Sequence, residues 1–370
     1  MIISFEKMME IAKENLVQQE DKRNINLSGI NNPNETKIKY HFLKYFPISF
    51  LIKIGIFYLN VGKGKKSINF FEDFVVSVVE KKYAFSFIEY LYKNNVYFDT
   101  SKYYFERKDV EEISKFLNAI ICFLINDFIK KNFYEKIVSF SAIRKVSSLY
   151  KEMRIDKNHL LINGIKYYYP YYFLPESFYF HHGLKELPKK VIKRLEGGTF
   201  IDCGVCKGDS ILVFQQYKPK KIIGFEPDEK NYRDAKVVIY KNKINKVILI
   251  KRGVGETEKE VLFNSESDGV SSISDQGNQK IEITTIDSLN EKIDLIKMDI
   301  EGYEYNAILG AEKTIKKYKP VLSISLYHTP RDFFEIPKLL KQWVPEYKMR
   351  FLNLNPLSPF FERVLFAYIE

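Results

Sequence analysis

The residues best suited to chemistry follow two apolar segments and combine glycine with acidic groups. The segment Phe200–Asp209 runs from apolar residues into Asp202, and Gly204 and Gly208 come next. Glycines here let a ligand approach the backbone closely, and the helix expected after them offers free N–H groups to an anion. Glu226 stands 24 residues beyond Asp202, where an acid can accept hydrogen bonds from both hydroxyls of a ribose. These four residues predict a nucleoside site.

The glycine pattern bears on which nucleoside binds. The dinucleotide fingerprint G-x-G-x-x-G is absent, because Asp202 stands where its first glycine would be. The step from Gly204 to Gly208 is also one residue too long for that fingerprint. The pattern therefore disfavours a dinucleotide, and with it a dehydrogenase. The structural alternative is a tight turn from a strand into a helix, with no ligand.

A second acidic pair ends the apolar segment Leu295–Met298. Asp299 and Glu301 lie two residues apart there, and His328 ends the next apolar segment. The two carboxylates could position a substrate hydroxyl, act as a base or hold a divalent metal, whereas the structural alternative is helix capping. Lys297 could pair with either acid, and His328 has the pKa of a base near neutral pH. We predict His328, Glu301 and Asp299 as catalytic residues and assign no metal ligand.

Two further motifs contain cysteine or histidine. Cys203 and Cys206 form a C-x-x-C, the pattern of a redox dithiol or of half a zinc site. No second C-x-x-C and no paired histidines accompany it, so we expect Cys203 to be an ordinary core residue. His182, in the segment His181–Gly183, is a candidate substrate contact on a loop.

The elements that carry these residues are strands and helices, which alternate after Gly197. Such alternation predicts a mainly parallel, doubly wound sheet, and two final strands without a helix between them predict one antiparallel member. That order is the one expected of a class I methyltransferase, a Rossmann-like fold. The expected strands are Thr199–Gly204, Lys221–Phe225, Val247–Arg252, Val261–Asn264, Ile281–Ile286, Asp294–Met298, Val321–Tyr327, Tyr347–Leu354 and Arg363–Ile369. The expected helices are Gly208–Tyr217, Asp228–Lys243, Gly302–Lys317 and Phe333–Val344.

The N-terminal half differs in charge and pattern. All of the net charge of +11 lies in residues 1–195, which hold 32 Lys and Arg against 21 Asp and Glu. Apolar residues recur there at helical spacing, as in Ile113–Leu124. We predict a mostly helical, basic domain at 1–150, an aromatic-rich connecting segment at 151–196 with short strands, and the α/β domain at 197–370.

Targeting signals and spans are not apparent in the sequence. The first ten residues contain Glu6, Lys7 and Glu10, which is not the pattern of a secretory signal. The most apolar runs, Phe46–Val61 and Phe116–Ile129, are interrupted by polar residues and do not predict a membrane span. Three cysteines make no disulfide framework. We therefore expect a cytoplasmic protein.

The chemistry-bearing segments together resemble those of FkbM-type methyltransferases. The resemblance covers about Phe178 to Glu370 and rests on Phe200–Ser210, Ile223–Pro227, Gly253–Gly255, Ile296–Gly302 and Ser325–His328. It implies a class I fold and O-methylation of sugars or secondary metabolites with S-adenosylmethionine as the cofactor. Residues 1–150 show no such resemblance.

The resemblance also implies roles for single residues. The residues expected to bind the cofactor are Asp202, Gly204, Lys207, Gly208, Asp209, Glu226, Pro227, Gly253 and Asp299. Ser271 and Ser272 match a Ser-Ser element of the acceptor region. One departure is Cys203 and Cys206, where the family has Ala and Asn more often; cofactor binding does not depend on them.

Two other functions stay open at this point. The basic N-terminal half could grip phosphates in an RNA methyltransferase, although its Lys and Arg are dispersed among acids, so a nucleic-acid partner is not expected. Alternatively, the protein could be a non-catalytic adaptor in surface-glycan assembly. The expected partners are a small-molecule or glycan acceptor, and a peripheral membrane or protein partner for the basic half.

Overall fold

A seven-stranded sheet forms the centre of the protein. The computed structural model describes residues 152–171, 174–264, 277, 279–355 and 361–370, the backbone of 272–273, and residues 86, 87, 90, 109, 112, 113, 116 and 148. The strand order is β13-β14-β12-β11-β4-β5-β6. The strands are β4 Thr199–Cys203, β5 Lys221–Phe225, β6 Val247–Ile250, β11 Leu295–Met298, β12 Val321–Ser325, β13 Lys348–Asn353 and β14 Arg363–Tyr368.

The directions of these strands confirm the predicted fold. Strands β12, β11, β4, β5 and β6 pair in parallel, whereas β14 runs antiparallel to both β12 and β13. One antiparallel strand in a mainly parallel sheet is the arrangement that the final two strands predicted. The chain therefore carries a class I methyltransferase fold in its C-terminal half.

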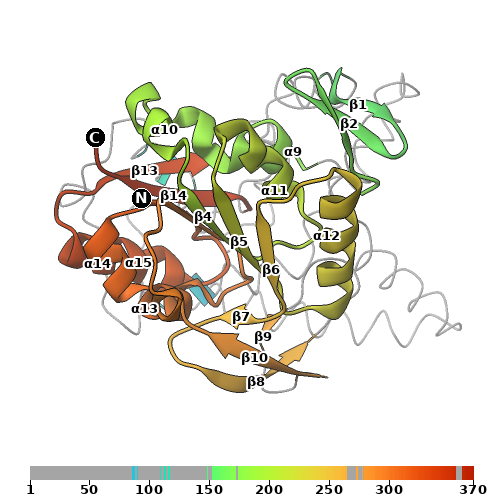
Figure 1. Ribbon diagram of the computed structural model, residues 1–370. Helices are drawn as coiled ribbons and strands as arrows, with labels where there is room; N and C mark the ends of the chain where they lie inside the picture. The colour runs from blue at the N-terminus through green and yellow to red at the C-terminus, as the bar shows by residue number, and fades with distance from the viewer. Residues whose placement is uncertain are drawn as a thin grey trace, which may run out of the picture.

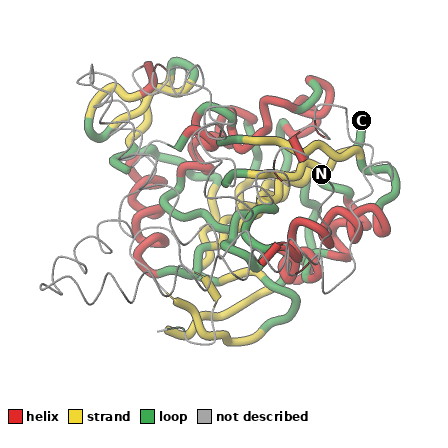
Figure 2. The backbone as a smooth tube through the Cα atoms, turned by 180° about the vertical axis from the view of Figure 1, so that it is seen from behind, coloured by secondary structure: helices red, strands yellow, loops and turns green. Residues whose placement is uncertain are grey.

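Helices cover both faces of the sheet (Figures 1 and 2). Alternate residues of each buried strand point to opposite faces, so Phe200 joins the cluster under α10–α12 and Ile201 joins the cluster under α13–α15. The helices are α9 Pro175–Phe178, η3 His181–Glu186, α10 Lys189–Leu195, α11 Asp209–Phe214, η4 Gln215–Tyr217, α12 Glu229–Lys241, η5 Asp287–Leu289, α13 Glu304–Leu309, α14 Glu312–Tyr318 and α15 Pro330–Trp343.

Two smaller sheets lie at opposite ends of the central one (Figure 1). An antiparallel sheet of β1 Arg154–Asp156, β2 His159–Ile162 and β3 Ile165–Tyr168 confirms the short strands expected in the connecting segment. The other sheet has the order β7-β10-β8-β9 and lies where β6 ends. Its strands are β7 Gly253–Val254, β8 Lys259–Asn264, β9 Ser272–Ile273 and β10 Gln279–Thr284.

The single helix expected at Gly302–Lys317 is wrong. The chain forms α13 and α14 instead, separated at Gly310, whose added Cβ would lie 1.9 Å from the carbonyl oxygen of Gly255. The carbonyl of Gly310 accepts from the N–H of Asp287, and the N–H of Thr314 donates to the side chain of Asp287. The helix also starts two residues late, because Glu301 and Gly302 have φ of 55° and 97°. Tertiary contacts with neighbouring loops therefore override a continuous helical pattern.

Some residues of the predicted N-terminal domain pack into the core of the α/β domain. Phe87, Ile113 and Phe116 are buried, and Phe116 stacks on Phe333 of α15 at a centroid distance of 4.9 Å. Asp109 accepts a hydrogen bond from Arg350 of β13 at 2.7 Å, and both side chains are buried. This part of the N-terminal half thus covers the β13 side of the domain; the remaining predictions for 1–150 fall outside the described residues.

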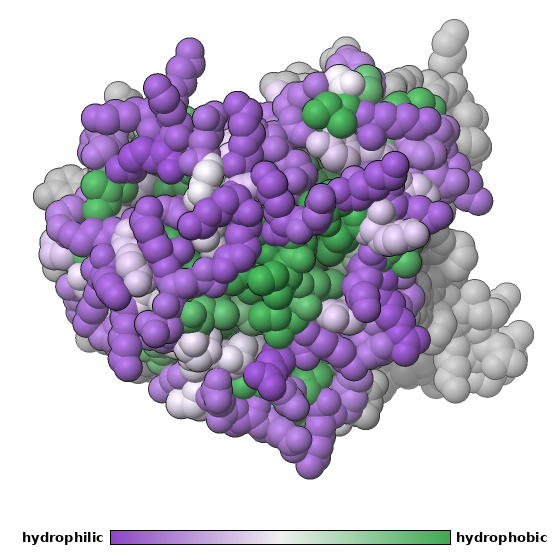
Figure 3. Space-filling model, in the orientation of Figure 1, coloured by the Kyte–Doolittle hydropathy of each residue, from purple (hydrophilic) through white to green (hydrophobic). Residues whose placement is uncertain are grey.

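The described surface is mostly hydrophilic. In the view of Figure 3, one apolar area lies near the centre of the face. Large apolar side chains exposed by about half include Ile155, Ile165 and Ile248, on β1, β3 and β6. Among the described residues, no helix has the length and apolar character needed to cross a membrane.

Candidate functional site

The loop after β4 is shaped by two glycines with positive φ. Gly204 has φ 83°, and a Cβ added to it would lie 1.9 Å from the carbonyl oxygen of Asp299. Gly208, with φ 86°, is the N-cap of α11. Only glycine fits both requirements at Gly204. The loops after β4 and β11 therefore touch, which brings the two acidic segments of the sequence into one site.

Asp202 lies at the centre of this site and is fully buried. Its carboxylate accepts a hydrogen bond from Ser210 and lies 3.2 Å from Nζ of Lys297. Lys297 also donates to the carbonyl oxygen of Gly204 at 2.7 Å. Burial raises the pKa of Asp202, and Lys297 and Ser210 oppose that shift. Burial lowers the pKa of Lys297, but the carboxylate of Asp202 and its acidic neighbours outweigh burial and raise it above its ordinary value.

The partner of Lys297 differs from the sequence expectation. The structure pairs it with Asp202, and it makes no ion pair with Asp299 or Glu301 within the described residues. The reason is strand register, because Lys297 of β11 lies directly beside Asp202 of β4. Lys297 therefore holds two adjacent strands together beneath the site.

Glu226 follows β5 and is 5% exposed. Its two oxygens accept hydrogen bonds from the N–H groups of Cys206 at 2.7 Å and Asp228 at 3.0 Å. Burial raises the pKa of Glu226 to about 8. An added Cβ at Gly253 would lie 3.9 Å from Pro227, so the start of β7 borders the same corner. The structure thus gathers the residues predicted for the ribose and adenine sides.

His182 lies beside the first turn of α11. Its Nε2 is 3.6 Å from Oδ2 of Asp209, which also accepts a hydrogen bond from Ser177 at 2.5 Å. Burial raises the pKa of Asp209, but the contacts with His182, Lys297 and Ser177 outweigh it and hold the pKa below its usual range. His182 has φ 50° within η3, so it occupies a left-handed position. The predicted substrate residue His182 and the predicted cofactor residue Asp209 are therefore neighbours.

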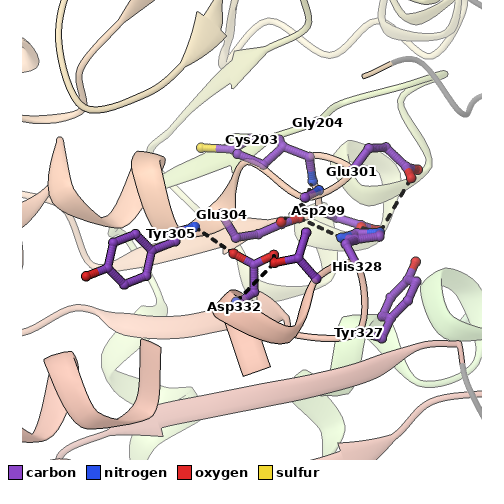
Figure 4. A network of polar contacts seen from close by, with 12 residues as sticks. Cys203, Gly204, Asp299, Glu301, Glu304, Tyr305, Tyr327, His328 and Asp332 are labelled. Atoms are coloured by element: carbon purple, nitrogen blue, oxygen red, sulfur yellow. Dashed lines mark hydrogen bonds and ion pairs between the residues drawn. The ribbon is translucent and has the colours of Figure 1, made fainter. Parts of the chain in front are cut away.

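The second acidic cluster surrounds the imidazole of His328 (Figure 4). Its Nε2 lies 3.5 Å from Oδ1 of Asp299 and 3.6 Å from Oε2 of Glu301. Oδ1 of Asp299 and Nε2 of His328 are buried atoms without a hydrogen bond. The three residues predicted to be catalytic thus come together at the ends of β11 and β12.

Glu304 is a member of this cluster that the sequence analysis missed. It is fully buried, and its Oε1 contacts Nδ1 of His328 at 2.8 Å (Figure 4). The same carboxylate accepts from the N–H groups of Ile300 at 2.8 Å and Gly302 at 2.9 Å. Its place in the first turn of the following helix was the available signal. The tight turn before α13 therefore presents a carboxylate to the back of the imidazole.

Charges inside the cluster shift two pKa values. Burial lowers the pKa of His328, but the carboxylates of Glu304 and Glu301 outweigh burial and raise it well above its ordinary value. Burial raises the pKa of Glu301 to about 7. The imidazole therefore carries a proton near neutral pH in this arrangement, and the cluster can both hold and release protons.

Two further buried acids, Glu176 of α9 and Glu362 just before β14, lie near this cluster. Tyr327 donates to Glu362 at 3.1 Å, and its ring lies 4.1 Å from the imidazole of His328, centroid to centroid. Glu176 of α9 is 5% exposed, and its Oε2 has no hydrogen bond. Burial, and then the charge of Glu362, raise the pKa of Glu176 well above its usual value. These residues were not predicted, because no local motif marks them.

The remaining candidates are placed less fully. Ser271 and the side chain of Ser272 lie outside the described residues. Cys203 and Cys206 are free thiols, and burial raises the pKa of both. Cys203 is fully buried in the core, as expected of an ordinary core residue. Lys207 lies over the ring of Tyr171 at 5.5 Å.

Comparison with known proteins adds a family to this geometry. Residues 202–351 match the model of the methyltransferase FkbM domain. No curated protein matches the sequence. Among solved structures, the chain is similar to methyltransferase FkbM from Methylobacillus flagellatus KT, with 20% identity and a TM-score of 0.49. That likeness covers 71% of this chain and 55% of the other, so this chain spans about half of its length.

Two other solved structures are less similar. An rRNA methylase from Streptococcus thermophilus has 13% identity and a TM-score of 0.34, and the likeness covers 49% of this chain and 93% of that one. An O-methyltransferase from Bacillus cereus in complex with SAH has 15% identity and a TM-score of 0.32, with 53% and 90% covered.

Proposed function

Because residues 202–351 are a methyltransferase FkbM domain, we propose that this protein is an S-adenosylmethionine-dependent O-methyltransferase. The acceptor is a hydroxyl of a sugar, a glycan or a secondary metabolite. One observation carries the proposal: the ends of β5, β4, β11 and β12 gather Glu226, Asp202, Asp299 and His328 around two touching loops.

The first half of the site fits an adenosyl cofactor. Glu226 is a buried carboxylate whose present partners are backbone N–H groups, so it has acceptor capacity for ribose hydroxyls. It lies at the carboxyl end of a strand, where ligands of open α/β sheets bind. The cofactor would supply a methyl group on a positively charged sulfur. Glu226 would hold the ribose, and the loop from Gly204 to Asp209 would hold the amino-acid part.

The second half of the site suits a hydroxyl acceptor. An alcohol is a weak nucleophile, so its transfer chemistry needs a group that takes the hydroxyl proton. His328 and Glu301 face the same point and lie 3.6 Å apart, and we propose that one of this pair accepts the proton. Asp299 orients the pair. Holding the hydroxyl oxygen in line with the methyl group would supply much of the rate increase.

Binding of the cofactor is the first test. Calorimetry of the full chain with S-adenosylmethionine should show one site, and Glu226→Ala should weaken it at least about tenfold, since hydrogen bonds to a charged group contribute about 1.5–3 kcal/mol. Glu229→Ala is the matched control, because Glu229 is an acid close in sequence whose pKa is lowered by exposed partners Lys251 and Arg233. No binding by the wild-type chain would overturn the proposal.

Transfer is the second test. The wild-type chain, incubated with methyl-labelled cofactor and an extract of hydroxylated acceptors, should label an oxygen, as mass spectrometry of the product would show. His328→Ala should lose turnover while it keeps cofactor binding. A label found on nitrogen or carbon would contradict the assignment of an oxygen acceptor.

A further inference from the structure

The imidazole of His328 is surrounded by more negative charge than one proton can balance. Asp299, Glu301 and Glu304 all lie within 3.6 Å of its two nitrogens. We propose that Asp299, Glu301 and His328 form a site for a divalent cation of the Mg²⁺ or Mn²⁺ class, which holds the acceptor hydroxyl. The inference rests on the proposed function for its role in catalysis, but the site itself is defined by side chains alone.

Glu304 prepares the histidine for this role. Its carboxylate is fully buried and is anchored by the N–H groups of Ile300 and Gly302. The contact of 2.8 Å to Nδ1 keeps a proton on that nitrogen, so the nitrogen left to bind an ion is Nε2, whose own proton a bound cation would displace. Histidines that bind metals nearly always donate their other ring N–H to a carboxylate or carbonyl in this way. Glu304 is therefore a positioning residue and not a ligand.

Two carboxylates border the Nε2 side of the histidine, and the ligand atoms of Asp299, His328 and Glu304 all lie within 4.8 Å of one another. Nε2 is 3.5 Å from Oδ1 of Asp299 and 3.6 Å from Oε2 of Glu301, too far for hydrogen bonds. Adjacent ligand atoms about 2.0–2.1 Å from one octahedral Mg²⁺ stand roughly 2.8–3.0 Å apart, so the partly exposed side chains of Asp299 and Glu301 would close in on an ion. His328 has a side chain only 8% exposed, and its Nε2 has no hydrogen bond. A buried, unpartnered nitrogen thus points at the place where the ion would lie.

The backbone supports the same arrangement. Glu301 holds φ 55°, a left-handed conformation that is costly for a residue with a side chain, and Gly302 continues the turn with φ 97°. The turn brings the carboxylate of Glu301 to the side of His328 that Asp299 faces (Figure 4). Two carboxylate oxygens suit Mg²⁺ or Mn²⁺, and the absence of a thiolate from the set disfavours soft metals such as Cu(I).

The cation would sharpen the division of roles. It would hold the hydroxyl oxygen and lower the pKa of that hydroxyl. The O–H bond then breaks with its electron pair left on oxygen, and the proton passes to the second carboxylate oxygen of Glu301. His328 would act as a ligand, and Glu301 would be the proton acceptor of the pair.

Manganese alone is the probe for this site. The full chain, stripped with a chelator, should bind one Mn²⁺ by calorimetry, and the spin-echo spectrum should show one coupled histidine nitrogen. His328→Ala and Asp299→Asn should each weaken binding at least tenfold, and Glu304→Gln about 10–100-fold, as for other partners of metal-bound histidine. His159→Ala is the control, since His159 pairs with an exposed aspartate far from the cluster and should leave binding unchanged.

Two results would overturn the inference: no Mn²⁺ binding by the wild-type chain, or no nitrogen coupling in its spectrum. The spectrum uses the unaltered protein, so a variant that misfolds does not decide the outcome. Binding of S-adenosylmethionine in the presence of chelator is measured on the same preparation. Cofactor binding without Mn²⁺ binding refutes the metal site alone, whereas Mn²⁺ binding without cofactor binding refutes the proposed function alone.

Discussion

The two acidic clusters of the site both contain Asp and Glu but differ in the partners of their carboxylates. On the β4–β5 side, Asp202 has Ser210 and Lys297, and Glu226 has two backbone N–H groups. On the β11–β12 side, Oδ1 of Asp299 and Nε2 of His328 have no hydrogen bond; Oδ1 of Asp202 has none either, but the cation of Lys297 lies 3.2 Å from it. Buried polar atoms are normally paired. The carboxylates of the β4–β5 side are thus held by donors and a cation of the fold, whereas the β11–β12 side has carboxylates around one imidazole.

Lys297 and Gly204 connect the two clusters. Lys297 reaches from β11 to Asp202 and to the carbonyl of Gly204, and Gly204 packs against the carbonyl of Asp299. A change on the β4–β5 side should therefore reduce stability, whereas a change on the β11–β12 side should reduce binding or turnover.

Replacing Lys297 with methionine should produce the largest loss of stability. The substitution keeps a long unbranched side chain but leaves the fully buried carboxylate of Asp202 without its cation. Breaking a buried ion pair on one side costs about 3–5 kcal/mol. Denaturant unfolding of the variant measures the change. The double variant Lys297→Met with Asp202→Asn should recover part of the loss, and a double variant no more stable than the single one would contradict the pairing.

Replacing Gly204 with alanine should cost about 2–4 kcal/mol, since overpacking costs about 1–3 kcal/mol and the positive φ adds to it. The added Cβ would lie 1.9 Å from a backbone oxygen of Asp299, which cannot move aside easily. Gly164→Ala is the matched control, because Gly164 has φ 78° and nothing within 4 Å of the added atom. Equal losses of stability in the two variants would show that the contact between Gly204 and Asp299 is not tightly packed.

The sequence predicts most of the β4–β5 side of the site and less of the β11–β12 side. Asp202, Gly204, Gly208 and Glu226 follow strands with strong patterns, and strand ends in a parallel sheet meet at one edge. Glu304 and His328 are 24 residues apart, and their contact depends on how two loops pack. No local pattern encodes such a contact, so the sequence offered His328 without its partner.

Long-range contacts explain the other differences. The break at Gly310 is set by the carbonyl of Gly255, far away in the chain. His182 was expected only as a loop contact, and its approach to Asp209 depends on three consecutive left-handed residues, His181, His182 and Gly183. Helical periodicity in the N-terminal half gave no indication that Phe87 would pack beneath α15. Pattern predicts which elements form; their contacts require the assembled fold.

Replacing Glu226 should change mainly how stability depends on pH. Burial raises its pKa from 4.5 to about 8. Between these values the folded chain keeps a proton that the unfolded chain has lost, so the folded state binds more protons. Stability therefore falls as pH rises through this window and levels off above about pH 8. Glu226→Gln removes the group, so its unfolding free energy should fall less steeply with pH than that of the wild type.

Cofactor binding should change in the opposite direction. Ribose hydroxyls donate hydrogen bonds, which favour the charged carboxylate, so the affinity of the wild type for S-adenosylmethionine should rise between about pH 6 and about pH 9. The affinity of Glu226→Gln should be nearly constant over this range and about tenfold or more weaker at its upper end. Calorimetry at several pH values measures both chains. A wild-type affinity that does not change with pH would show that Glu226 does not bind the cofactor. Its buried carboxylate would then be a structural group of the β4–β5 side.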